Sequence, residues 1–125
     1  MTVLIDSWAW IEYFRGSKAG EQIKGVIEDS EEKMVISTIN IAEVYRSILR
    51  FYSEDFAEEK IEAMKQRAFV CDVIEEIAVE AAKIKHKKKW GLGDSLIYAT
   101  AKKEGARVLT GDPDFKDVEG VIFIE

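Results

Sequence analysis

The chain has 125 residues, 47% of them hydrophobic, which excludes a disordered protein and suits one folded domain over residues 1–125. The net charge of −6 argues against binding of nucleic acid by the whole surface. A single cysteine and a single histidine exclude an intrachain disulfide and the usual zinc-site spacings, so a functional metal would be held by oxygen. No apolar run reaches about 18 residues and no signal peptide is recognisable, so we expect a cytoplasmic protein without membrane contact.

Short apolar runs alternate along the chain with longer segments whose apolar residues recur at helical spacing. Strands are predicted at residues 2–5, 34–37, 69–73, 107–110 and 121–124. Helices are predicted at residues 7–15, 18–30, 40–49, 55–68, 74–88 and 94–104. Because strands that alternate with helices favour a parallel sheet covered on both faces, we expect an α/β fold.

Four carboxylates lie where a predicted strand passes into a helix or turn, or where a helix begins. They are Asp6, Glu43, Asp94 and Asp112. Because the carboxyl ends of parallel strands share one edge of the sheet, these acids could meet in one pocket. Like charges at that distance repel, and a divalent cation removes the repulsion. Carboxylate oxygens suit Mg²⁺ or Mn²⁺, so the pattern indicates a metal-dependent phosphoryl-transfer site.

Each acid also has an ordinary structural explanation. Asp6 and Asp94 could cap helices, and Asp112 is a usual turn residue. Asn40 and Glu43 have the spacing of a capping box. Capping does not explain why acids stand at several crossovers of one predicted sheet, so their conjunction favours a shared site.

Two hydroxyls and two arginines lie close to these acids in the sequence. Ser7 and Thr110 could orient a metal-bound water, although helix capping is the favoured interpretation for Ser7 and strand propensity is the alternative for Thr110. Arg46 and Arg50 share a helix face with Glu43 and could reach a phosphate backbone. An intrahelical ion pair with Glu43 is the alternative.

A lysine-rich segment, residues 83–89, precedes Asp94. Lys87, Lys88 and Lys89 could guide nucleic acid toward that acid. The alternative is a solvated helix end, where cations suit the helix dipole.

The first predicted helix is crowded with aromatic residues. Trp8, Trp10, Tyr13 and Phe14 exceed what one short helix can bury in a small core, so some of them could form a surface for a partner. Complete packing in the core is the alternative.

Four segments carry a resemblance to a known family, and they are residues 3–7, 36–44, 93–101 and 109–115. In this order and spacing the chain resembles the PIN domain, and within it the VapC-type toxin ribonucleases of prokaryotes. The resemblance implies an α/β/α sandwich with a twisted five-stranded parallel sheet of strand order 3-2-1-4-5. It also implies a metal-dependent ribonuclease that hydrolyses RNA phosphodiester bonds, and a homodimer inhibited by a cognate antitoxin. The antitoxin would contact the helix at 7–15 and the helices at 40–68.

The same resemblance implies roles for the acids. Asp6 and Asp94 would be direct ligands of Mg²⁺ or Mn²⁺, and Asp112 would complete the pocket. Glu43 would be a ligand or would position the attacking water, and Asp114 is a possible additional acid. The hydroxyl of Thr110 matches one that often precedes the third acid of the family pattern, here Asp112, by two positions.

Two alternatives remain open. A PIN-like module could bind RNA or a partner without catalysis, and a PIN nuclease could act in RNA processing outside a toxin system. A phosphoacceptor domain of the receiver type is disfavoured, because Asp6 stands alone after the first strand and no lysine follows the last strand.

Overall fold

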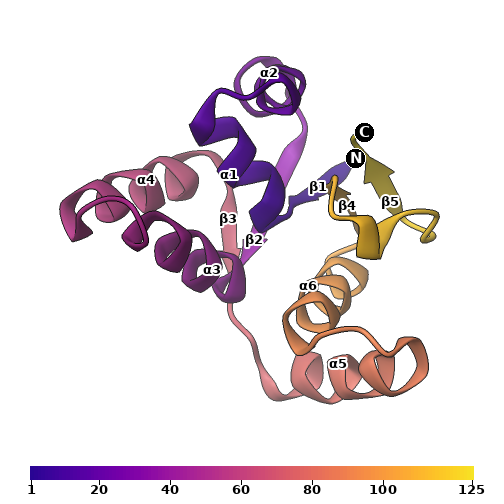
Figure 1. Ribbon diagram of the computed structural model, residues 1–125. Coiled ribbons are helices and arrows are strands. Elements are labelled where there is room, and N and C mark those ends of the chain that lie inside the picture. Colours follow the sequence, from indigo (N-terminus) through magenta and orange to yellow (C-terminus); the bar gives the residue numbers. More distant parts are fainter.

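A five-stranded parallel sheet forms the centre of the computed structural model, which describes residues 1–125 (Figure 1). The strands are β1 (Thr2–Ile5), β2 (Lys33–Ser37), β3 (Phe69–Cys71), β4 (Ala106–Thr110) and β5 (Val121–Phe123). Their order in the sheet is β3-β2-β1-β4-β5, and every neighbouring pair is parallel. The predicted fold class and strand order are therefore confirmed.

Eight helical segments surround this sheet. They are α1 (Ser7–Arg15), α2 (Lys18–Lys24), η1 (Gly25–Asp29), α3 (Thr38–Leu49), α4 (Glu54–Arg67), α5 (Glu75–Lys88), α6 (Leu92–Lys103) and η2 (Pro113–Phe115). None of the helices is both long enough and apolar enough to cross a membrane.

Alternate residues of each strand face opposite layers of helices. Val3 and Ile5 of β1 belong to the larger core, which the helices α1 to α4 cover. Leu4 lies on the other face and packs against Ile97 of α6. Helix α5 packs on α6, and the buried residues between these two helices form a separate, smaller cluster. Because both faces of the sheet are covered, the structure is the predicted α/β/α sandwich.

Three predicted helices differ from the structure by more than one residue at a boundary. Residues 18–30 form the helix α2 followed by the π-helical turn η1, although Ile23 and Ile27 are both buried as the helical spacing predicted. Helix α3 begins at Thr38, before the predicted start at residue 40. Helix α6 likewise begins at Leu92, before the predicted start at residue 94.

The aromatic residues of α1 pack into the core. Trp10 is 1% exposed, and Trp8, Tyr13 and Phe14 are partly buried against the larger core cluster. The core interpretation therefore holds for Trp10, whereas the other three residues keep part of their surface exposed. The most exposed aromatic residue of the chain is instead Phe51, which is 77% exposed after the end of α3.

Candidate metal centre

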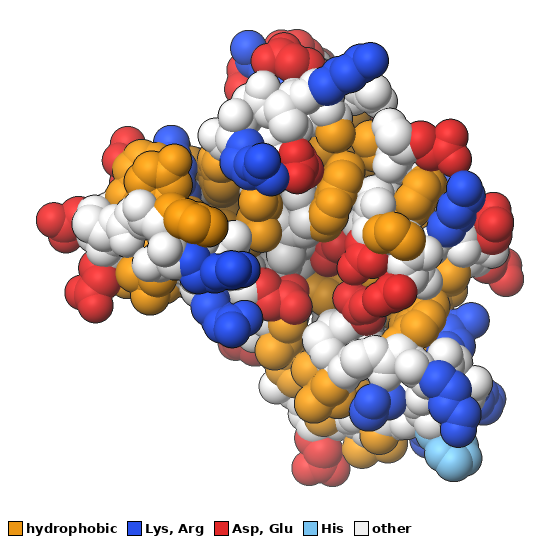
Figure 2. Space-filling model, in the orientation of Figure 1, with side chains coloured by type: hydrophobic (Ala, Val, Ile, Leu, Met, Phe, Trp, Pro, Cys, Tyr) orange, Lys and Arg blue, Asp and Glu red, His pale blue; other side chains and the backbone are white.

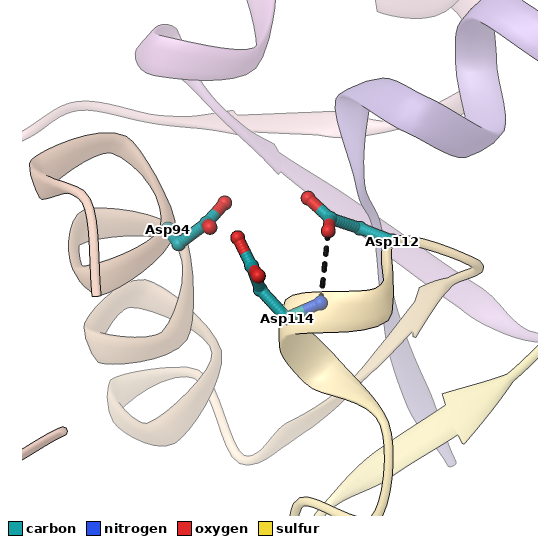
Figure 3. A group of neighbouring side chains, drawn as sticks. All are labelled: Asp94, Asp112 and Asp114. Atoms are coloured by element: carbon teal, nitrogen blue, oxygen red, sulfur yellow. Dashed lines mark hydrogen bonds between the residues drawn. The ribbon is translucent and has the colours of Figure 1, made fainter. Parts of the chain in front are cut away.

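Three carboxylates meet at the carboxyl edge of the sheet (Figure 3). Asp94 lies in the first turn of α6, Asp112 precedes η2, and Asp114 lies within η2. One oxygen of each carboxylate lies within 4.8 Å of the other two. The backbone N–H of Asp114 donates to the Asp112 carboxylate at 3.0 Å, which closes this turn. The turn interpretation of Asp112 is therefore confirmed, while its carboxylate also belongs to the acidic cluster.

Asp6 directly follows β1 and is more deeply buried than these three acids. Its side chain is 4% exposed, and its backbone N–H continues the sheet by donating to the Leu109 carbonyl at 3.1 Å. Asp6 occupies the N-cap position of α1, but its carboxylate makes no capping hydrogen bond. The carboxylate instead accepts a hydrogen bond from the Thr110 hydroxyl at 2.8 Å. Capping therefore does not explain this acid.

Thr110 connects two of the acids. Its hydroxyl donates to Asp6 and accepts a hydrogen bond from the backbone N–H of Asp112 at 3.0 Å. The residue is fully buried at the end of β4. Because a hydroxyl has one proton, the bond from the Asp112 N–H directs that proton to Asp6.

Glu43 reaches the cluster from the second turn of α3. Its Oε1 accepts a hydrogen bond of 2.6 Å from the Ser7 hydroxyl. Its Oε2 lies next to Gly93 of α6, 2.9 Å from the position that a Cβ atom of that residue would occupy. The capping interpretation of Ser7 is wrong, since Ser7 follows the N-cap of α1 and donates its proton to Glu43.

Two other capping predictions are also wrong. The capping box of α3 joins Ser37 to Asn40, not Asn40 to Glu43, because the helix begins two residues earlier than predicted. The N-cap of α6 is Gly91, so Asp94 lies inside the first turn and caps nothing. Glu43 and Asp94 are therefore free to face the cluster.

Burial and mutual repulsion raise the pKa values of two acids. Burial is the main cause that raises the pKa of Asp6 to about 6, and the Glu43 and Asp112 carboxylates add to it against the Thr110 hydrogen bond. Burial also raises the pKa of the half-buried Asp94 to about 7, with Asp112 and then Asp6 as the strongest charged neighbours. The acids separated in sequence thus form one electrostatic unit.

The donor set fits a hard divalent cation. Oxygens on opposite sides of Mg²⁺ are about 4.2 Å apart, close to the 4.8 Å limit that encloses the oxygens of Asp94, Asp112 and Asp114. A cation there would offset the repulsion that raises the pKa of Asp94. Asp114 is only a possible additional acid in the sequence pattern, whereas the structure puts it in the tightest group of acids.

The acids lie in a hollow of the surface between α1, α3 and α6, and basic side chains over α3 and α5 flank them (Figure 2). Arg46 on α3 and Arg50, directly after it, are exposed, and no ion pair joins either to Glu43. The largest surface pocket, about 710 Å³, lies elsewhere, between α5 and α6. Two of the glutamates that line it, Glu76 and Glu80, form ion pairs with Lys103 and Lys102, so we assign the chemistry to the carboxyl edge of the sheet.

Fold and site together define an α/β protein with a cluster of carboxylates at the carboxyl edge of its parallel sheet. A family profile described as PIN domain matches residues 3–121. The chain therefore belongs to the PIN domain family, as the sequence resemblance implied. No curated protein sequence gives a significant match.

Solved structures share the whole fold at low identity. The chain is similar to one from a toxin–antitoxin complex of Klebsiella pneumoniae, with 22% identity, a TM-score of 0.79, and coverage of 96% of this chain and 95% of that chain. It is similar to VapC20 of Mycobacterium tuberculosis, with 15% identity, a TM-score of 0.78, and coverage of 98% and 99%. PAE2754 of Pyrobaculum aerophilum matches with 17% identity, a TM-score of 0.72, and coverage of 98% and 89%.

The raised pKa of Asp6 predicts how stability depends on pH without metal. Because its pKa rises from 3.8 to about 6 on folding, the stabilisation is complete below the unfolded value and is lost as the pH rises through about 6. For this buried acid the loss is on the order of 3 kcal/mol. In metal-free buffer we expect Asp6→Asn to raise the melting temperature at about pH 7.5 and to change it little at about pH 4.

The control for this measurement is Asp29→Asn, which changes an exposed acid outside the cluster. Thermal melting of both variants and the wild type at the two pH values is sufficient. If Asp6→Asn lowers the melting temperature at about pH 7.5, Asp6 is not under electrostatic stress. Independently of this comparison, we expect added Mg²⁺ to raise the melting temperature of the wild type at about pH 7.5, and to raise that of Asp94→Asn much less.

Proposed function

We propose that the protein is a ribonuclease that uses Mg²⁺ or Mn²⁺ to hydrolyse RNA phosphodiester bonds, and that it is the toxin of a toxin–antitoxin pair. The observation that carries this proposal is the convergence of Asp6, Glu43, Asp94, Asp112 and Asp114 at one edge of the sheet. Membership of the PIN domain family supports it. VapC20, which has the same fold, is described as a toxin that cleaves the sarcin–ricin loop.

The residues divide the work as their positions allow. The cation would be held by Asp94, Asp112 and Asp114. Asp6, oriented by Thr110, would add a buried carboxylate to the site. When bound, the cation lowers the pKa of a coordinated water and neutralises charge on the phosphoryl group. Glu43 keeps Oε1 on Ser7 and leaves Oε2 to accept a proton from the attacking water. Attack on phosphorus that releases the 3′ oxygen leaves a 5′-phosphate and a 3′-hydroxyl.

The first test is cleavage of a mixed-sequence RNA by the purified protein. We expect cleavage with Mg²⁺ or Mn²⁺, none with EDTA, and a rate at least about 100-fold lower for Asp94→Asn, because several kcal/mol of transition-state stabilisation depend on the cation. Gel analysis of end-labelled RNA measures both the rate and the end groups.

Asp29→Asn, purified in the same way, controls for contaminating nucleases. Equal cleavage by the wild type and Asp94→Asn would contradict the proposal. RNA binding without cleavage by metal-loaded protein would favour a non-catalytic PIN-like module instead.

We also propose that basic residues beside the acids bind the RNA backbone. Lys83, Lys87, Lys88 and Lys102 line a pocket of about 360 Å³ between α5 and α6. Lys88 lies 5.2 Å from the centre of the Trp90 ring. Trp90 in turn contacts Phe115 in η2, the turn that carries Asp114, with ring centres 5.0 Å apart. The pocket is thus linked to the acidic cluster through two aromatic rings.

The remaining predicted RNA contacts have different surroundings. Lys89 lies past the end of α5 in a left-handed conformation and does not line this pocket. Arg46 lies on α3 and Arg50 directly follows it. Figure 2 shows basic side chains over that helix on another side of the acids than those over α5. We propose that these arginines bind phosphates on the other side of the scissile bond.

Replacing Lys87 and Lys88 together by alanine should weaken binding of single-stranded RNA. The slope of log affinity against log salt concentration should fall by about 0.7 for each phosphate that the variant no longer neutralises. Lys18 and Lys24, exposed on α2, provide a control with the same change of charge. An equal effect of both double variants, measured by fluorescence anisotropy over a salt series, would show that only net charge matters.

The proposed antitoxin requires a surface outside the acidic cluster. Ile11, Ile48, Phe51 and Tyr52 line a groove of about 520 Å³ between α1 and the end of α3, with two arginines among its other lining residues. Phe51 and Tyr52 are 77% and 62% exposed. An amphipathic segment with acidic residues would fit this groove, and the toxin–antitoxin complexes with this fold support such a partner.

A small protein encoded next to this gene is the expected antitoxin. Its addition should suppress RNA cleavage, and Phe51→Ser should weaken that suppression by removing exposed apolar area from the groove. Titration of cleavage against the partner measures both effects. Suppression that is unchanged in Phe51→Ser would show that the antitoxin binds another surface.

We also propose that the protein forms a homodimer. Sedimentation equilibrium would show this as twice the mass of the chain.

A further inference from the structure

Asn40 is a fully buried polar side chain on α3 that the proposed mechanism does not use. Its Oδ1 accepts a hydrogen bond from the Ser37 backbone N–H at 2.8 Å. Its Nδ2 donates to the Ser7 hydroxyl at 2.9 Å. A flipped amide would place its NH₂ group against the Ser37 N–H, donor against donor, so the backbone determines the orientation of this amide.

The orientation of Asn40 determines the direction of the next hydrogen bond. The Ser7 oxygen already accepts from Asn40, and a serine hydroxyl has one proton to donate. That proton goes to Oε1 of Glu43 at 2.6 Å, a length typical of a hydroxyl that donates to a carboxylate. A chain of three hydrogen bonds therefore runs from the start of α3 to Glu43.

Glu43 depends on this chain for its position. Glu43 is an exposed residue, and its long side chain can adopt several rotamers. The bond from Ser7 is the hydrogen bond that holds its carboxylate. With Oε1 held there, Oε2 lies against Gly93, the residue before Asp94. Without that bond, no hydrogen bond opposes rotation of the carboxylate into solvent.

We propose that Asn40 is a positioning residue that acts through Ser7 to hold the Glu43 carboxylate inside the acidic cluster. Asn40 and Glu43 are three residues apart on one helix face, so α3 supplies both the start and the end of the chain of hydrogen bonds. Ser7 bridges them from α1. The inference rests on the proposed metal site and adds the residue that orients one of its acids.

The test compares Asn40→Ala, Ser7→Ala and the double variant with Ser53→Ala. Ser53 caps α4 by accepting from the Phe56 N–H at 3.2 Å, so its variant reports the effect of losing a helix cap away from the cluster. Both Asn40→Ala and Ser53→Ala should lower the melting temperature by about 3–6 °C. Ser7→Ala keeps the cap of α3, and it remains informative if Asn40→Ala fails to fold.

Two measurements read out the position of Glu43. In metal-free crystal structures of Asn40→Ala and Ser7→Ala, we expect the Glu43 carboxylate to leave Gly93. Affinity for Mn²⁺ alone, measured by electron paramagnetic resonance, should fall about 10-fold in each, as is typical when an outer-shell group of a metal site is displaced. The double variant should lose no more than either single variant, because the two residues act in series. Ser53→Ala should keep the wild-type affinity.

A Glu43 carboxylate that stays against Gly93 in these structures would overturn the proposal, as would Mn²⁺ affinities within about twofold of the wild type. Failure of the proposed function has a different signature. It would appear in the wild type itself, as absence of Mn²⁺ binding or of RNA cleavage. The position of Glu43 in the variant structures would still decide the role of Asn40.

Discussion

Repulsion among carboxylates at one edge of the sheet is the constraint on which the site depends. Burial adds to this repulsion at Asp6, which is 4% exposed, lies near other acids, and has a pKa raised to about 6. Burying a charge is unfavourable unless a partner compensates it, and the Thr110 hydroxyl compensates only part of it. Functional sites often retain such strain. A divalent cation is the simplest group that would remove it.

Sheet topology explains why these acids meet. In the parallel register Ile5 lies opposite Leu109, so the next residues along β1 and β4, Asp6 and Thr110, emerge side by side. Helix α6 runs back toward the start of β4, which brings its first turn and Asp94 to the same edge. The turn after β4 adds Asp112. The Thr110 and Ser7 hydroxyls then orient Asp6 and Glu43, which lie outside the tightest group of acids.

Sequence reasoning succeeded where the signal was periodic and failed where it was local. Hydrophobic spacing predicted five strands and their alternation with helices, and the resemblance implied the strand order that the structure has. Spacing also suggested a capping box at Asn40 and Glu43, because it could not show that α3 begins at Thr38. The same error hid the partner of Ser7. Its hydroxyl could not be assigned without knowing that α1 and α3 start side by side.

The sequence by itself determined the fold class, the four acids at strand and helix ends, and the family, because apolar periodicity and motif order are properties of the chain. Only the tertiary structure decided which acids form the tightest group, giving Asp114 a place beside Asp94 and Asp112. It also decided that Thr110 serves Asp6 and that Ser7 serves Glu43. These partners lie 104 and 36 residues apart in sequence, and contacts at such separations arise only when parallel strands and their helices pack together.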